Sequence, residues 1–195
     1  MNILNNLDTI ITNILNSLGT VGPLLGCFLI IIESMIPILP LSVFITLNFY
    51  AFGQILGFII SYLFTILGCY ISYSLVKHSL KGPFDRYLDS KEHKQLNKLK
   101  KIFNTIKLEN LVLLIALPFT PAFMINIAAG LSEMSKKKYL TALAIGKIFL
   151  VYFWGYVGVT LIDSIKHPIY LLKILVLMLI AYTLSKLINK KTGVE

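Results

Sequence analysis

An acidic residue and two prolines interrupt one of the most apolar stretches of the chain. Glu33, Pro37 and Pro40 lie among isoleucine, leucine and methionine residues. A carboxylate in hydrocarbon costs roughly a few kcal/mol, so we expect Glu33 to face protein or water and to have a task. Each proline removes a helical hydrogen bond and disfavours helix at the preceding residue, which predicts a broken helix. Broken backbone at membrane depth must be shielded by protein or line a cavity.

The composition indicates an integral membrane protein. Of the 195 residues, 56% are hydrophobic and 14% are charged, and the mean hydropathy is +0.79. These values favour an all-α membrane protein with one compact domain. The net charge of +9 does not indicate nucleic-acid binding, because the lysines are concentrated beside apolar segments, as the positive-inside rule requires. Anionic lipid headgroups are the expected electrostatic partner.

The first apolar run predicts a re-entrant helical hairpin near residues 24–52. An unbroken helix over this run would be over about 40 Å long, so a hairpin that enters and leaves on one face fits a bilayer better. Gly53 and Gly57 follow it. Their spacing is typical of close helix packing, and it equally fits a glycine turn followed by an ordinary spanning helix.

A second re-entrant hairpin is predicted near residues 111–131, where Pro118 and Pro121 break another apolar run. Basic residues fill 77–107 before it and 136–138 after it, so both flanks are expected on the cytoplasmic side. A segment with both flanks on one side cannot cross the membrane. Residues 139–161 and 169–185 are then expected to cross, which leaves the basic C-terminus cytoplasmic.

The remaining segments complete a three-part organisation. Residues 1–19 have the helical spacing of an amphipathic interfacial helix, and 77–107 contain a basic amphipathic helix expected on the membrane surface. The membrane domain covers 20–165. Residues 166–195 supply a C-terminal transmembrane helix and a basic tail.

The two proline pairs share the PxxP spacing, and each is followed by a glycine-ended stretch and a spanning helix. In each unit the hairpin does not cross the membrane and the following helix crosses it once, so the chain changes sides once per unit. The second unit therefore starts on the opposite side from the first, and the two units are inverted relative to each other. Inverted repeats of this kind bring discontinuous helices together near the midplane, where they form a substrate site. The alternative is a chance match of a short pattern.

These motifs resemble the DedA superfamily, also called the VTT-domain or SNARE-associated Golgi protein family. The residues that carry the resemblance are Glu33-x-x-x-Pro37-x-x-Pro40, Gly68-x-x-x-x-Tyr73 and Pro118-x-x-Pro121-x-x-x-x-Asn126-x-x-x-Gly130. The resemblance covers roughly residues 20–165 and implies two facing re-entrant hairpins. It implies phospholipid scrambling as in eukaryotic relatives, or translocation of undecaprenyl phosphate or phospholipid, coupled to protons or sodium, in a bacterial plasma membrane.

The chain departs from the family pattern at one position. Many relatives carry an arginine shortly before the second PxxP, whereas residues 113–117 are wholly apolar here. The expected cation for a phosphate headgroup is therefore missing. Lys147, directly after Gly146, is the nearest substitute.

The predicted substrate or ion site consists of Glu33, Pro37, Pro40, Pro118, Pro121, Asn126, Gly130 and Lys147. Glu33 either exchanges protons near neutral pH or is a neutral or lysine-paired structural acid. The prolines shape the hairpin tips, where free backbone amides can bind phosphate. Asn126 either donates to a headgroup or caps broken backbone. Lys147 attracts phosphate, pairs with Glu33, or extends to the interface.

Lipid transport or scrambling is the expected function, and the alternatives are an enzyme and a non-transporting membrane factor. An enzyme is disfavoured because His78, His93 and His167 have no metal-ligand spacing and no nucleophile, base and orienting acid can be assembled, so no catalytic residue, metal or cofactor is expected. A non-transporting membrane-organising or assembly factor would need the amphipathic helices but no titratable Glu33.

Overall fold

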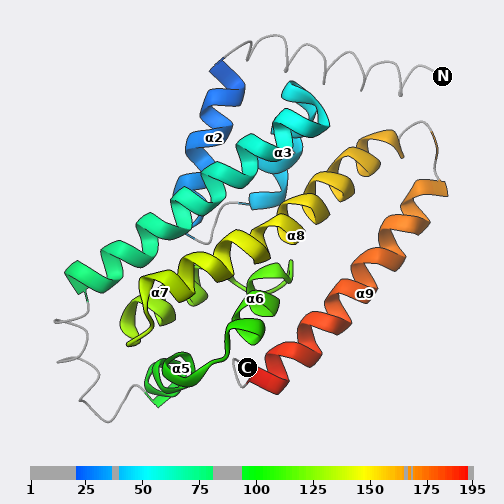
Figure 1. The fold of residues 1–195 in the computed structure, drawn as a ribbon. Helices are drawn as coiled ribbons and strands as arrows, with labels where there is room; N and C mark the ends of the chain where they lie inside the picture. The colour runs from blue at the N-terminus through cyan, green and yellow to red at the C-terminus, as the bar shows by residue number, and fades with distance from the viewer. Residues whose placement is uncertain (1–20, 37–39, 81–93, 165–166, 168, 193–195) are drawn as a thin grey trace.

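The computed structural model describes residues 21–36, 40–80, 94–164, 167 and 169–192, and every regular element in these ranges is a helix. The predicted amphipathic helix at 1–19, Pro37 and the middle of the basic segment lie outside these ranges. In chain order the helices are α2 (Val21–Glu33), α3 (Leu41–Leu75), η1 (Val76–Leu80), α5 (Lys94–Thr105), α6 (Leu108–Ala116), α7 (Ala122–Leu131), α8 (Lys136–Asp163) and α9 (Ile169–Thr192) (Figure 1).

Three of these segments are long and apolar enough to cross a membrane. They are Leu41–Ser79, Lys136–Asp163 and Ile169–Thr192. The all-α membrane class is therefore confirmed for the described residues. Re-entry of the hairpins and inversion of the repeat remain predictions.

The first hairpin consists of two short helical segments joined at the Pro40 region. Within the described residues, helix α2 covers 13 residues, which is about 20 Å of helix. Pro40 is the N-cap of α3 and has extended backbone (φ −80°, ψ 100°). The second segment of the hairpin, residues 41–52, is the returning segment. It ends at Gly53, which has φ 77° and ψ 175°. Only glycine adopts this backbone readily.

Gly57 lets the two parts of α3 on either side of Gly53 touch. A Cβ atom added at Gly57 would lie 2.6 Å from the carbonyl oxygen of Asn48 and 2.6 Å from Cα of Phe49. Residues 41–52 therefore fold back on residues 54–75. Both interpretations of the glycine spacing hold in part: Gly53 makes a turn, and Gly57 permits close packing.

The second hairpin repeats the order of elements in the first. Helices α6 and α7 have 9 and 10 residues, too few to cross a membrane alone. Pro121 is the N-cap of α7 and has extended backbone (φ −65°, ψ 110°), as Pro40 has at α3. Each pair of short helices is followed by a long one.

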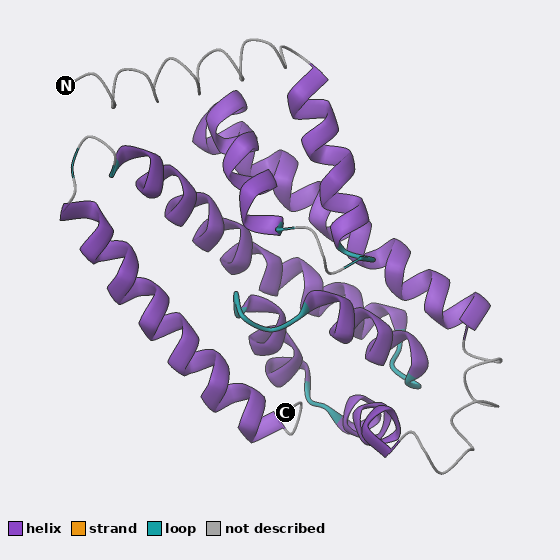
Figure 2. Ribbon diagram, turned by 180° about the vertical axis from the view of Figure 1, so that it is seen from behind, coloured by secondary structure: helices purple, strands orange, loops and turns teal. Residues whose placement is uncertain are grey.

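Helix α8 packs against both hairpins through its glycines. A Cβ at Gly146 would lie 2.7 Å from Ile115 of α6, and one at Gly155 would overlap the ring of Phe49 in the first hairpin. The returning segment of the first hairpin therefore packs on α8. Figures 1 and 2 show α8 beside the two hairpins, with α9 along its outer side.

Helix α5 forms where the basic amphipathic helix was predicted, and it contributes to the main core. Phe103 and the following Ile106 are buried in the cluster formed by α3, α6, α7 and α8. Lys138 donates a hydrogen bond to the carbonyl oxygen of Ile106. The segment is thus attached to the protein, and its contact with a membrane surface remains a prediction.

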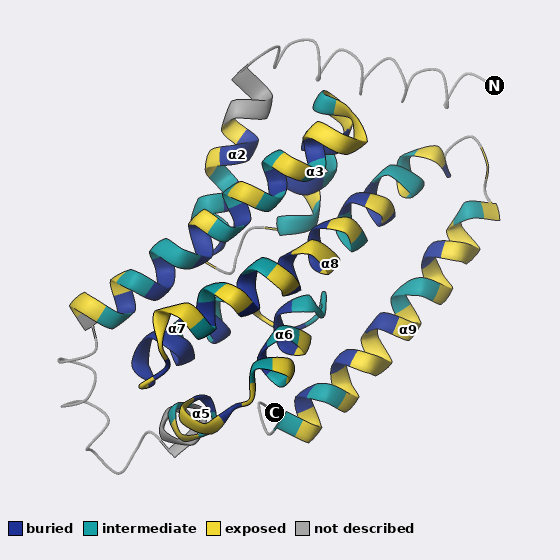
Figure 3. Ribbon diagram, in the orientation of Figure 1, coloured by how far each residue is buried: buried dark blue, intermediate teal, exposed yellow. Residues whose placement is uncertain are grey.

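Large apolar side chains remain exposed on the long helices, and Figure 3 shows exposed positions along α3, α8 and α9. Helix α9 is the clearest case, with Leu172, Leu179 and Leu187 among its exposed residues. In water such a surface would favour association or aggregation, whereas in a bilayer it contacts lipid.

Candidate functional site

The ends of the two hairpins border one cavity of about 400 Å³, which we call the central cavity. The first hairpin contributes Glu33 and residues 40–42, and the second contributes residues 118–123. Leu150 and Trp154 of α8 complete the lining. The two proline pairs are far apart in sequence, and the fold brings Pro40, Pro118 and Pro121 to the same cavity as the acid.

Two helices begin at the central cavity. Helix α3 starts at Leu41 and α7 starts at Ala122, and both residues line the cavity. The first N–H groups of a helix have no partner within the helix, and its N-terminus carries partial positive charge. The central cavity therefore has the electrostatic character of an anion site, although no cationic side chain is among its described lining residues.

Glu33 lies at the opposite kind of helix end. It is the last residue of α2, where the carbonyl groups disfavour a negative charge. Its Oε2 atom is buried and has no hydrogen-bond partner among the described residues. Lys147 interacts with it electrostatically. The carboxyl is therefore incompletely satisfied by the described residues.

Lys147 lines a second, much smaller cavity. Its side chain is 1% exposed, which excludes the predicted alternative of extension along the surface to the interface. The cavity has a volume of about 10 Å³ and is also lined by Thr120, Asn126 and Leu143, which leaves room for about one water molecule. We call it the lysine cavity.

Asn126 connects the two hairpins. Its Nδ2 donates to the carbonyl oxygen of Ser34 at 3.0 Å, and its Oδ1 accepts from the hydroxyl of Tyr139 at 2.6 Å. Ser34 follows the last residue of α2, so Asn126 caps broken backbone across the hairpins. Both polar atoms of the amide therefore have a partner within the protein.

Removal of the Tyr139 hydroxyl is expected to destabilise the protein by about 1–3 kcal/mol, because Tyr139→Phe leaves Oδ1 of Asn126 buried with one donor fewer. Thermal unfolding of the purified protein in detergent would measure this change. Tyr152→Phe is the matched control, since Tyr152 is 64% exposed, and its unfolding should match that of the unchanged chain. Equal unfolding of both variants would contradict a structural role for the Tyr139 bond.

The other predicted site residue lies apart from both cavities. A Cβ at Gly130 would lie 2.8 Å from Cβ of Val76 and 3.0 Å from the carbonyl oxygen of Tyr73, so Gly130 permits α7 to approach α3 and η1. Sequence reasoning missed Ser34, Thr120 and Tyr139, which have no distinctive spacing.

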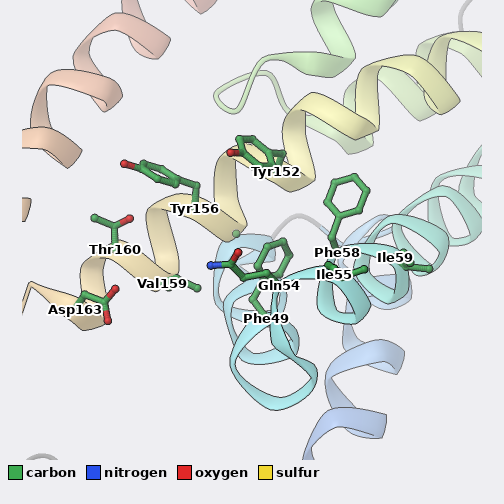
Figure 4. A pocket seen from close by; sticks show the side chains of 11 residues that line it. Phe49, Gln54, Ile55, Phe58, Ile59, Tyr152, Tyr156, Val159, Thr160 and Asp163 are labelled. Carbon is green, nitrogen blue, oxygen red and sulfur yellow. The ribbon is translucent and has the colours of Figure 1, made fainter.

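A third cavity of about 460 Å³ lies between the kink of α3 and the C-terminal half of α8 (Figure 4). Gln54 and Ile55 line it from α3, and Tyr152, Tyr156 and Asp163 line it from α8. It is larger than the central cavity, but it includes neither proline pair and no cationic side chain among the described residues. Within these residues no group of three or more His, Cys, Asp or Glu side chains is arranged to hold a metal ion.

Comparisons with known proteins agree on one family. The family model described as the VTT domain matches residues 36–160. An uncharacterized membrane protein, YhjE of Bacillus subtilis (strain 168), is 30% identical over 159 residues, which cover 82% of this chain and 76% of YhjE. No solved structure matches the chain significantly. The family match includes both proline pairs, whereas Glu33 precedes it and α9 follows it.

Proposed function

Since this chain belongs to the VTT-domain family, the DedA superfamily, we propose that it moves lipids between the leaflets of a membrane. The substrate is a phospholipid or a polyprenyl phosphate. The observation that carries the proposal is the central cavity, where the ends of both hairpins meet beside Glu33. A cavity between discontinuous helices is the usual place for a transporter's substrate site.

The cavity supports binding of an anionic headgroup through backbone dipoles. The N-termini of α3 and α7 both begin there, and helix N-termini bind phosphate without any cationic side chain. This arrangement compensates for the arginine that is absent before Pro118. Lys147, in the adjacent lysine cavity, adds positive charge from behind Thr120, which borders both cavities.

Glu33 can couple the movement of an ion to the movement of a lipid headgroup through the central cavity. A carboxylate and a phosphate are both anions, so they compete for the same helix N-termini. Uptake of a proton or of a sodium ion at Glu33 neutralises the carboxylate and favours entry of the headgroup. Release of that ion favours its departure. Ion movement and lipid movement are then linked through one side chain.

A membrane-organising factor without transport activity accounts less well for this geometry, because it requires no incompletely bonded acid beside a cavity. Catalysis is not part of the proposal, since Glu33 is the only ionisable side chain among the described residues that line the central cavity. A single acid cannot supply a nucleophile, a base and an orienting group.

The three candidate spans and the family indicate a membrane protein. We propose that the protein lies in a bacterial plasma membrane, with residues 77–107 and the C-terminus on the cytoplasmic side. The positive-inside rule supports this orientation, because these two segments carry most of the basic residues near the apolar helices.

The proposal is tested by reconstitution of the full chain in vesicles that contain a fluorescent phospholipid or a fluorescent polyprenyl phosphate. A membrane-impermeant quencher added outside reports lipid that arrives in the outer leaflet. We expect the chain to accelerate the movement of at least one of the two lipids relative to protein-free vesicles. If neither lipid moves faster, with and without a pH or sodium gradient, the proposed function is wrong.

A further inference from the structure

Helix α9 lies beyond the residues that define the family match, and it is attached to the rest of the protein by few side chains. The match ends at residue 160, whereas α9 covers Ile169–Thr192. Its buried residues are Ile174, Ala181, Ser185 and Asn189. Two of these four are polar, and burial of a polar group in a membrane is costly unless it has a specific partner. Ser185 Oγ has no hydrogen-bond partner among the described residues, whereas Asn189 has one.

The partner of Asn189 is the tip of the second hairpin, by which we mean residues 117–121 between α6 and α7. Thr120 Oγ1 donates to Oδ1 of Asn189 at 3.2 Å, and both side chains are buried. The neighbouring Phe119 ring packs edge-on against Tyr182 of α9, with centroids 5.7 Å apart, and against Trp154 of α8, at 6.2 Å. Helix α9 therefore holds the tip by a hydrogen bond and by an aromatic contact.

The tip lies between the central cavity, which is lined in part by Glu33, and the lysine cavity, which is lined in part by Lys147. Thr120 lines both the central cavity and the lysine cavity, as do Ala122 and Leu150. Glu33 lines only the first of these cavities, and Lys147 lines only the second. Among these shared lining residues, Thr120 is bonded to α9.

We infer that α9 is a latch, in which Asn189 and Tyr182 are positioning residues that hold the second hairpin tip over Lys147. When the Thr120–Asn189 bond opens, the lysine cavity joins the central cavity, and the ammonium group of Lys147 completes the anion site. This inference rests on the proposed function for its purpose, but the opening itself is measurable without any lipid movement.

The test follows the accessibility of the lysine cavity in the full chain, with Cys27 and Cys69 replaced by alanine. Leu143→Cys is the reporter, because Leu143 lines the lysine cavity and not the central cavity. A small, water-soluble methanethiosulfonate reagent is applied to the protein in vesicles, and the labelled fraction is followed by mass spectrometry. Phe123→Cys places a thiol in the central cavity. Its labelling shows that the reagent reaches the central cavity.

Labelling of Leu143→Cys is expected to be slow in the otherwise unchanged chain and about fivefold faster with Asn189→Leu, the factor that corresponds to one typical hydrogen bond. Thr120→Val breaks the same bond from the other side with little change in shape and should have the same effect. Thr183→Val is the matched control, because the Thr183 hydroxyl is exposed and bonds only within α9.

Two results would overturn the latch. One is an unchanged labelling rate of Leu143→Cys in both Asn189→Leu and Thr120→Val, while Phe123→Cys is labelled normally. The other is the same acceleration by Thr183→Val, which would mean that any change in α9 loosens the protein. Because the readout is labelling, a failure to move lipids in the vesicle assay leaves this result interpretable.

Discussion

Glu33→Gln is expected to slow lipid movement in vesicles by at least about tenfold, equivalent to about 1.4 kcal/mol in the barrier. Glutamine keeps the shape of the side chain but can neither take up a proton nor balance the charge of Lys147. The ion-linked competition with a phosphate headgroup is therefore lost. The measurement is the initial rate of fluorescent-lipid arrival in the outer leaflet, for protein that is monodisperse in detergent before reconstitution.

Two further variants separate the coupling role of Glu33 from charge balance. Glu109→Gln is the matched control on the exposed first turn of α6, and its rate should equal that of the unchanged chain. Glu33→Gln combined with Lys147→Met removes both charges and should remain slow. If the double variant recovers the full rate, Glu33 only neutralises Lys147, and the proposed coupling is wrong.

Gly57→Ala is expected to destabilise the protein by about 1–3 kcal/mol, the usual cost of overpacking. The added methyl group would meet backbone atoms of Asn48 and Phe49 at 2.6 Å, and backbone cannot rotate away as a side chain can. This loss outweighs the gain of about 1 kcal/mol that alanine gives over glycine within a helix. Thermal unfolding in detergent, followed by circular dichroism, would measure it.

Gly26→Ala provides the comparison for this prediction. A Cβ there meets only Oδ1 of Asn48, at 3.4 Å, so helix propensity should dominate and the variant should be as stable as the unchanged chain or more stable. Equal losses at Gly57 and Gly26 would mean that the first hairpin does not pack on residues 54–75 as described.

The prolines predicted more of the fold than any other residues. Pro40 and Pro121 fix φ and cannot donate a hydrogen bond, so the helix breaks at both positions follow from local chemistry alone. Their repeated spacing also led to the expectation that the hairpin ends meet, and both residues line the central cavity. Glu33 was recognisable because an acid in an apolar run is unusual whatever its partners are.

The residues that hold the hairpins in place were not predictable in the same way. Tyr139, Thr120 and Asn189 act through partners that are distant in sequence, and a periodic pattern contains no information on such pairs. Lys147 is ambiguous from sequence because a lysine about two turns into a predicted helix can extend to the interface or turn inward. Only tertiary packing, which places Ile115 of α6 and Asn126 of α7 around the same small cavity, determines that it is buried.

The route of the lipid is tested most directly by blocking each large cavity in turn. Phe123→Cys places a thiol in the central cavity, and Tyr156→Cys places one in the cavity between the α3 kink and α8. Both changes are made in the chain with Cys27 and Cys69 replaced by alanine, and each protein is treated with a bulky maleimide before the vesicle assay. We predict that modification at residue 123 stops lipid movement and that modification at residue 156 leaves it unchanged. Undiminished movement after complete modification at residue 123 would contradict the central cavity as the lipid pathway.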